Sequence, residues 1–181
     1  MKTDITSTKN KYRVIYADPP WSYTDKCHAG NRGAEYKYPC MKIEDIKNLP
    51  IRDICDPDCV LFRWVTFPML REGLDTIESW GFTYKTVGFN WIKRNKKSGT
   101  WFMGMGNWTR SNSEICLIGV RGKPKRINAG ILSVIGTPIE RHSKKPDIVR
   151  ERITSLCGDV PRIELFARQE SEGWDCWGNE V

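Results

Sequence analysis

The sequence has no long apolar run, and this excludes most membrane-spanning architectures. Across its 181 residues, no stretch approaches the roughly 20 consecutive apolar residues that a helix needs to cross a bilayer. The first ten residues are polar and contain no apolar core, so they do not resemble a secretion signal. We therefore expect a cytoplasmic protein that does not act at a membrane.

The sequence also lacks the cysteine and histidine patterns of disulfide-rich and metal-binding proteins. It contains seven cysteines, an odd number, and only Cys55 and Cys59 are close together. The two histidines, His28 and His142, are far apart and are not in a metal-ligand spacing. We predict free, partly buried thiols and no bound metal.

The composition that remains is typical of one folded domain. Hydrophobic residues make up 39% of the chain and charged residues 28%, a balance that excludes fibrous and wholly disordered proteins. The length suits a single core better than two domains. We predict a flexible polar arm over residues 1–11 and a single domain over residues 12–181.

Positive charge is concentrated in one part of the chain. The net charge is +7, and residues 85–126 contain ten basic residues but only one acidic residue, Glu114. A basic segment of this kind is typical of a surface that binds a polyanion, although a solvated loop without a partner has the same composition.

Apolar runs alternate with helical patterns along the chain. The helix at 146–156 is expected to begin with Pro146, with Asp147 in its first turn. This order is typical of a three-layer α/β fold with a mainly parallel sheet. Strands are predicted over residues 13–17, 59–65, 82–93, 114–120 and 162–166, and helices over 67–80 and 146–156. A short helix or turn is predicted over 43–49, loops over 21–38 and 94–110, and a strand or irregular chain over 131–139.

A short polar motif, Asp18-Pro19-Pro20-Trp21, follows the first predicted strand directly. In open α/β sheets, ligands bind beyond the carboxyl ends of the strands. The Asp18 carboxylate and the Pro19 carbonyl can each accept a hydrogen from an exocyclic amine such as adenine N6, which frees the nitrogen lone pair for attack. Trp21 offers a ring for base stacking. The alternative is a turn after a strand, with Trp21 in the core.

The motif resembles the signature of the MT-A70 family of S-adenosylmethionine-dependent adenine N6-methyltransferases. Further stretches resemble that family in the same order, so the likeness covers nearly the whole chain. They are residues 38–41, 61–66, 90–93, 114–122, 142–147, 164–168 and 177–179.

The resemblance implies a Rossmann-like methyltransferase in which the catalytic strand precedes the cofactor strand. It implies that S-adenosylmethionine donates the methyl group and that no metal takes part. Asp18, Pro19, Pro20 and Trp21 would form the catalytic motif. The cofactor would contact Asp18, Lys145, Glu164, Leu165, Phe166, Arg168, Asn179 and Glu180, and the substrate would contact Tyr38, Trp91, Lys93, Arg94, Lys96, Lys97 and Arg110.

The sequence departs from the family pattern at the cofactor residues. It lacks the glycine-rich loop of typical Rossmann methyltransferases, and Phe166, Ala167 and Arg168 stand where small residues are expected. Glu180 replaces a glutamine of the larger members, and a carboxylate accepts hydrogen bonds from a ribose but cannot donate one as an amide does. Only Asp4 precedes the first strand, where those members carry a cofactor-binding Asp.

The expected function is methylation of adenine N6 in DNA by a member of the bacterial or phage type, acting in the cytoplasm of a bacterium or an infected host cell. Two alternatives stay open: an RNA adenine methyltransferase, and a catalytically silent paralogue that only binds nucleic acid. The intact Asp18 motif disfavours the silent paralogue. The target sequence, and whether the chain works as a dimer with itself or with another subunit, stay open as well.

Overall fold

A computed structural model describes residues 1–21, 40–106, 108–141 and 144–181. The predicted substrate residue Tyr38 lies outside the described residues, and so do Cys27 and both histidines. Almost all of the predicted loop at 21–38 lies outside them too.

The described residues form an α/β fold around one mostly parallel sheet. Its strands are arranged in the order β5-β3-β4-β2-β1-β6-β7. Only β4 runs opposite to its neighbours, since both β2 and β3 pair with it in antiparallel fashion. The strands are β1 (Tyr12–Ala17), β2 (Cys55–Val65), β3 (Thr83–Arg94), β4 (Ser113–Arg121), β5 (Val134–Pro138), β6 (Arg162–Leu165) and β7 (Asp175–Trp177).

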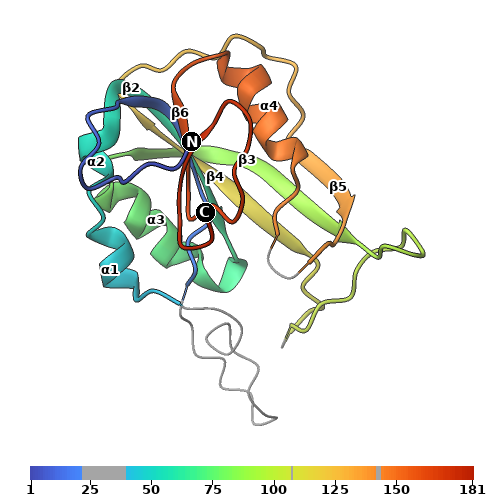
Figure 1. Cartoon of the computed structure of the whole chain (residues 1–181). Helices are drawn as coiled ribbons and strands as arrows, with labels where there is room; N and C mark the ends of the chain where they lie inside the picture. The colour runs from blue at the N-terminus through green and yellow to red at the C-terminus, as the bar shows by residue number, and fades with distance from the viewer. Residues whose placement is uncertain (22–39, 107, 142–143) are drawn as a thin grey trace.

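Helices pack against both faces of this sheet because residues along β2 alternate between two apolar clusters. Leu61 and Val65 join the cluster that contains Ile77 of α3, whereas Phe62 and Trp64 join the cluster that contains Val149 of α4. Figure 1 accordingly shows α1, α2 and α3 together on one side and α4 apart from them. The helices are α1 (Ile43–Lys47), α2 (Ile51–Ile54), α3 (Leu70–Ser79, preceded by a 3-10 turn at Phe67–Met69) and α4 (Ile148–Cys157).

The amino-terminal residues differ from the flexible arm that the sequence predicts. Thr3 N–H donates to the Cys176 carbonyl at 2.8 Å, and Cys176 N–H donates to the Met1 carbonyl at 2.9 Å. Ile5 is buried in the core. The first residues therefore run beside β7, a three-residue strand too short to show a period in the sequence.

Helix α4 begins later than predicted. Its first helical residue is Ile148, so Pro146 precedes the helix and Asp147 occupies the N-cap position. The Asp147 side chain makes no capping bond; its carboxylate accepts hydrogen bonds from Lys144 and Arg150 instead.

Parallel strand direction brings the sequence motifs to one edge of the sheet, which we call the catalytic edge. Strands β1, β2, β3 and β6 all end there, because β1 pairs in parallel with β2 and β6, and β3 runs parallel to β2 across β4. Asp18 follows β1 at this edge, and Ser113 and Glu114 begin β4 there. Lys123 and Lys125 follow β4 at the opposite edge, so the basic segment is divided between two ends of the molecule.

Candidate active site

Asp18 lies at the catalytic edge and is paired with Lys145. The Lys145 ammonium donates a hydrogen bond to Oδ2 of Asp18 at 2.8 Å. Both side chains are largely buried, with 25% of the Asp18 side chain and 11% of the Lys145 side chain exposed. The two residues are 127 positions apart in the chain, and the sheet brings the end of β1 close to the segment before α4.

Glu114 extends this pair into a chain of four charges, which we call the Asp18 charge cluster. Its Oε2 lies 3.2 Å from the Lys145 ammonium, and its Oε1 accepts a hydrogen bond from Lys93. Lys93 is near the end of β3 and Glu114 near the start of β4. The cluster therefore holds two acids and two bases, Asp18, Lys145, Glu114 and Lys93, and its formal charge is balanced.

Burial and charge act in opposite directions on the pKa values in this cluster. Burial raises the pKa of Asp18 above its usual value, and the attraction of Lys145 only partly offsets this. Burial also opposes ionisation of Glu114, but Lys145 and Lys93 outweigh it and lower the pKa of Glu114 to about 2. Burial disfavours the Lys145 cation, yet Asp18 and Glu114 together hold its pKa above the usual value. Lys145 is therefore a permanent cation between two carboxylates.

Glu114 should contribute stability that depends on pH. Its pKa falls from 4.5 in the unfolded chain to about 2 in the fold, so its contribution is present well above pH 4.5 and is lost as the pH falls toward 2. We expect Glu114→Gln to lower the melting temperature at pH 7 by roughly 5–10 °C, following from a free-energy loss of about 3 kcal/mol. The difference from the wild type should shrink in melts recorded at successively lower pH. A difference that stays constant down to pH 2.5 would contradict this assignment.

The backbone of the Pro-Pro turn keeps an acceptor at the catalytic edge. Trp21 N–H donates to the Pro19 carbonyl at 3.0 Å, and Met41 N–H donates to the Pro20 carbonyl at 2.9 Å. A carbonyl oxygen has two lone pairs, so the oxygen of Pro19 can accept a second hydrogen bond. This fits the predicted contact with an amine.

Trp21 is a buried residue with a charged neighbour over its ring. Only 6% of it is exposed, and the guanidinium of Arg63 lies 4.2 Å from the ring centroid. This placement favours the core alternative for Trp21 over an open stacking surface for a base.

Arg63 is a residue that the sequence-based site prediction missed. It is fully buried on β2, lies 5.3 Å from the ring of Trp80, and donates to the Gly73 carbonyl at 3.2 Å. Burial lowers its pKa to about 9, and the charge of Asp18 opposes that shift. The available signal was a single basic residue in the otherwise apolar run over residues 59–65.

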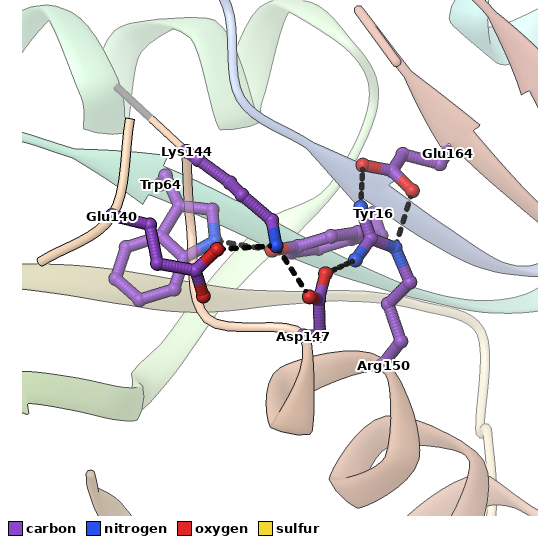
Figure 2. Close-up of polar contacts among 7 residues, drawn as sticks. All are labelled: Tyr16, Trp64, Glu140, Lys144, Asp147, Arg150 and Glu164. Carbon is purple, nitrogen blue, oxygen red and sulfur yellow. Dashed lines mark hydrogen bonds and ion pairs between the residues drawn. The ribbon is translucent and has the colours of Figure 1, made fainter. Parts of the chain in front are cut away.

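A second polar network lies between α4 and the ends of β1 and β6. Figure 2 shows that both Glu164 oxygens accept hydrogen bonds from Arg150, at 2.6 and 2.8 Å. Arg150 also bonds to Asp147, which in turn accepts from Lys144. Burial raises the pKa of Glu164 although Arg150 opposes it. Arg150 thus fixes the orientation of the predicted cofactor residue Glu164, and no sequence pattern identified it.

The other predicted cofactor residues gather where β6 and β7 end. Leu165 is a buried core residue. Phe166 has a backbone in the left-handed region, with φ 60°. Its ring packs edge-to-face on the ring of Trp177, with 5.2 Å between the ring centroids. Nε of Arg168 lies 3.4 Å from Oε1 of Glu180. Asn179 and Glu180 are both exposed beyond β7. The fold therefore brings most of the predicted cofactor residues to one side of Asp18.

The predicted substrate residues on β3 are wholly or partly buried, whereas those in the segment after it are exposed. Trp91 is buried, with its indole N–H donating to the Thr137 carbonyl at 3.3 Å, and Lys93 lies over its ring. Arg94 is half-buried over the ring of Trp101. The exposed group consists of Lys96, Lys97 and Arg110 in the segment between β3 and β4.

Metal-binding and membrane-spanning features are not found in the described part of the chain. Among its His, Cys, Asp and Glu side chains, no three are grouped so that they could hold a metal ion. Its six cysteines are free thiols. None of its helices combines the length and the apolarity needed to span a bilayer.

Comparison with known proteins identifies the family. The family model of MT-A70 matches residues 12–180. The chain belongs to the MT-A70 family. The resemblance that rested on the Asp18 motif and on the order of the later segments is therefore confirmed.

Named relatives agree with this family assignment. The chain is 35% identical to the type II methyltransferase M.MunI of Mycoplasma sp, over 96% of this chain and 79% of the relative. It is 29% identical to the N(6)-adenosine-methyltransferase MT-A70-like protein of Drosophila melanogaster and 30% identical to the human N(6)-adenosine-methyltransferase catalytic subunit METTL3. These two matches cover 94% and 97% of this chain but only 27% and 29% of the relatives.

Proposed function

We propose that this chain transfers a methyl group from S-adenosylmethionine to N6 of adenine in DNA. The reaction class follows from the family and its named methyltransferases, so the expected adenine N6-methyltransferase is confirmed. The choice of DNA over RNA is our inference. The observation that carries the proposed mechanism is the buried pairing of Asp18 with Lys145 at the end of the parallel strands.

The residues around Asp18 fit the proposed methyl donor chemically. Bound S-adenosylmethionine supplies a methyl group attached to a positively charged sulfur. Lys145 is a cation suited to the donor's carboxylate, and Asp18 is an acidic group suited to its positive charge. Glu180 and Asn179 are exposed acceptors suited to the ribose hydroxyls, and Phe166 with Trp177 offers apolar rings beside them.

Asp18 and Pro19 are the residues proposed to bind the target amine of the substrate. The carboxylate of Asp18 accepts one N6 hydrogen and the carbonyl of Pro19 accepts the other, which draws the lone pair out of the ring. Both contacts strengthen as positive charge develops on the nitrogen, and such differential stabilisation lowers the barrier. Lys145 holds the Asp18 carboxylate in place. No strong base is needed, because the methylated nitrogen releases its extra proton readily.

The comparison with relatives supports DNA over RNA. The chain covers 79% of the type II methyltransferase but only 27% and 29% of the two relatives named for adenosine. The exposed basic group Lys96, Lys97 and Arg110 fits a phosphate backbone of either nucleic acid.

Methyl transfer from labelled S-adenosylmethionine to three substrates tests the proposal. The substrates are duplex DNA, single-stranded DNA and RNA of matched sequence, and the product is identified as N6-methyladenine. We expect transfer to DNA. Transfer to RNA alone would establish the RNA alternative, and binding without transfer to any substrate would establish the silent paralogue.

The salt dependence of DNA binding tests the exposed basic group. If Lys96 and Lys97 contact phosphates, changing both to Ala should reduce the slope of log affinity against log salt by roughly 0.9 for each lost contact. The affinity for all duplex sequences should fall to the same extent. The matched control changes Lys123 and Lys125 to Ala, because these exposed lysines belong to the same basic segment but lie at the opposite edge. Equal slopes for both double variants would refute the assignment.

A further inference from the structure

The segment between β3 and β4 divides into two lobes at the catalytic edge. The first lobe is a hairpin over residues 94–101, in which Asn95 N–H donates to the Thr100 carbonyl at 2.8 Å. The guanidinium of Arg94 lies 4.7 Å from the ring centroid of Trp101 and closes the base of this hairpin. Figure 1 draws the segment projecting beyond the ends of β3 and β4. We call the hairpin over residues 94–101 the basic lobe, because it carries Lys96 and Lys97.

The second lobe, residues 102–106 and 108–112, is anchored at both ends to one residue. Phe102 N–H donates to the Lys93 carbonyl at 2.9 Å, and Lys93 N–H donates to the Asn112 carbonyl at 2.8 Å. The Lys93 side chain belongs to the Asp18 charge cluster through Glu114. The base of the second lobe is therefore tied to the same charged cluster that holds Asp18.

Two glycines make the second lobe narrow. A Cβ atom added to Gly104 would overlap the Ser111 carbonyl oxygen, and one added to Gly106 would overlap the Thr109 carbonyl oxygen. The outgoing and returning chains therefore run in direct backbone contact. A narrow two-chain projection of this kind can enter a nucleic-acid groove, as a two-stranded ribbon enters the major groove.

Large apolar side chains are exposed on this narrow lobe. The exposed fractions of Met103, Met105 and Trp108 are 71%, 76% and 101%. Side chains of this size are normally buried, and an exposed group of them marks an interaction site. The sequence from Arg94 to Ser113 contains four basic residues and no acidic residue, so the charge around the group favours a polyanion.

We propose that the second lobe inserts into the base stack of duplex DNA beside the target adenine, with Trp108 taking the stacking place that the adenine leaves. This inference rests on the proposed function. A paired adenine must leave the helix before its N6 can reach Asp18, and this unstacking costs a few kcal/mol. In other DNA-binding proteins, apolar side chains inserted between base steps partly unstack the bases and kink the duplex. The basic lobe holds the adjoining phosphates.

The proposal predicts a substrate-dependent defect. The probe is a DNA that carries the adenine methylated by the wild type, prepared as a duplex, as a single strand, and as a duplex with an abasic site opposite that adenine. Trp108→Ala should lower kcat/KM on the intact duplex by about 10-fold or more, the effect of losing one base stack. Its kcat/KM on the single strand should stay within about twofold of the wild type, because no base pair has to be opened there. On the abasic duplex the loss should be smaller than on the intact duplex, because the adenine must still be unstacked but no pairing has to be broken.

Two control variants separate stacking from other roles. Trp108→Phe keeps an aromatic face and should retain most of the duplex activity. Leu132→Ala removes another exposed apolar side chain, from the segment before β5 at the opposite edge, and should match the wild type on all three substrates.

Each alternative result has a distinct meaning. If Trp108→Ala slows methylation of all three substrates equally, or of none of them, the proposed insertion of the second lobe is wrong, while DNA methylation stands. If sedimentation shows that Trp108→Ala dissociates a dimer, the second lobe contacts another copy of the chain and its proposed insertion into DNA is likewise wrong. If the wild type methylates no DNA, both the proposed function and the proposed insertion fail.

Discussion

Replacing Asp18 with Ala should remove methyl transfer almost completely. The loss should exceed the roughly 100-fold decrease typical of one missing hydrogen-bonding group, because the variant lacks both the acceptor for N6 and a negative charge near the developing positive one. Asp18→Asn keeps an acceptor oxygen at nearly the same place but lacks the charge, so its rate should fall between those of Asp18→Ala and the wild type. Single-turnover rates with saturating cofactor and DNA would measure the chemical step directly.

Binding measurements separate the role of Asp18 in chemistry from a role in folding. DNA affinity should survive both substitutions, because the exposed lysines Lys96 and Lys97 lie in a different segment. Both variants must also melt near the wild-type temperature, since Asp18 is paired with a buried lysine. A folded Asp18→Ala protein that transfers methyl groups at a near-normal rate would return Asp18 to the role of a turn residue after a strand.

The fold could be predicted from the sequence wherever a strand or helix has a strong apolar pattern. The strands around Ile15, Leu61 and Leu117 are confirmed because each is an apolar run between polar segments. The pairing of β7 with the first residues could not be predicted, since three residues show no period and their partners lie more than 170 positions away. Likewise, no local pattern shows that β4 runs against its neighbours.

The candidate site was predictable only where a family motif supplied it. Asp18 and Lys145 were both predicted, but the sequence did not show that they pair with each other. Glu114 stood out as the single acid in a basic segment and as the first residue of a stretch that resembles the family, but the sequence did not predict it as a site residue. Its role depends on the β3–β4 register, which sets Trp91 opposite Glu114 and brings Lys93 within reach. Tertiary packing also decides the position of Trp21, which lies in the core against Arg63.

Two neighbouring lysines allow a matched test of the cofactor site. The Lys145 side chain is 11% exposed and pairs with the largely buried Asp18 and Glu114. The Lys144 side chain is 18% exposed, but its partners Glu140 and Asp147 are about half exposed. Exposed ion pairs contribute little free energy, about 0–1 kcal/mol each. Lys144 is linked to Glu164 through Asp147 and Arg150, and Arg150 binds both Glu164 oxygens directly. Lys144→Ala should therefore bind S-adenosylmethionine and transfer methyl groups nearly as the wild type does.

Lys145→Ala should instead weaken S-adenosylmethionine binding about 30-fold or more, as expected when one partner of a desolvated charge pair is removed. The attraction of Lys145 lowers the pKa of Asp18 against the effect of burial, so without this cation that pKa should rise further. An active enzyme needs the Asp18 carboxylate, and the acid limb of the kcat–pH profile should therefore move to higher pH in Lys145→Ala but not in Lys144→Ala. Calorimetry of cofactor binding and the pH profile test these two effects separately. Wild-type cofactor affinity together with an unmoved acid limb would show that Lys145 only stabilises the fold, and a matched melting temperature ensures that the comparison is made between folded proteins.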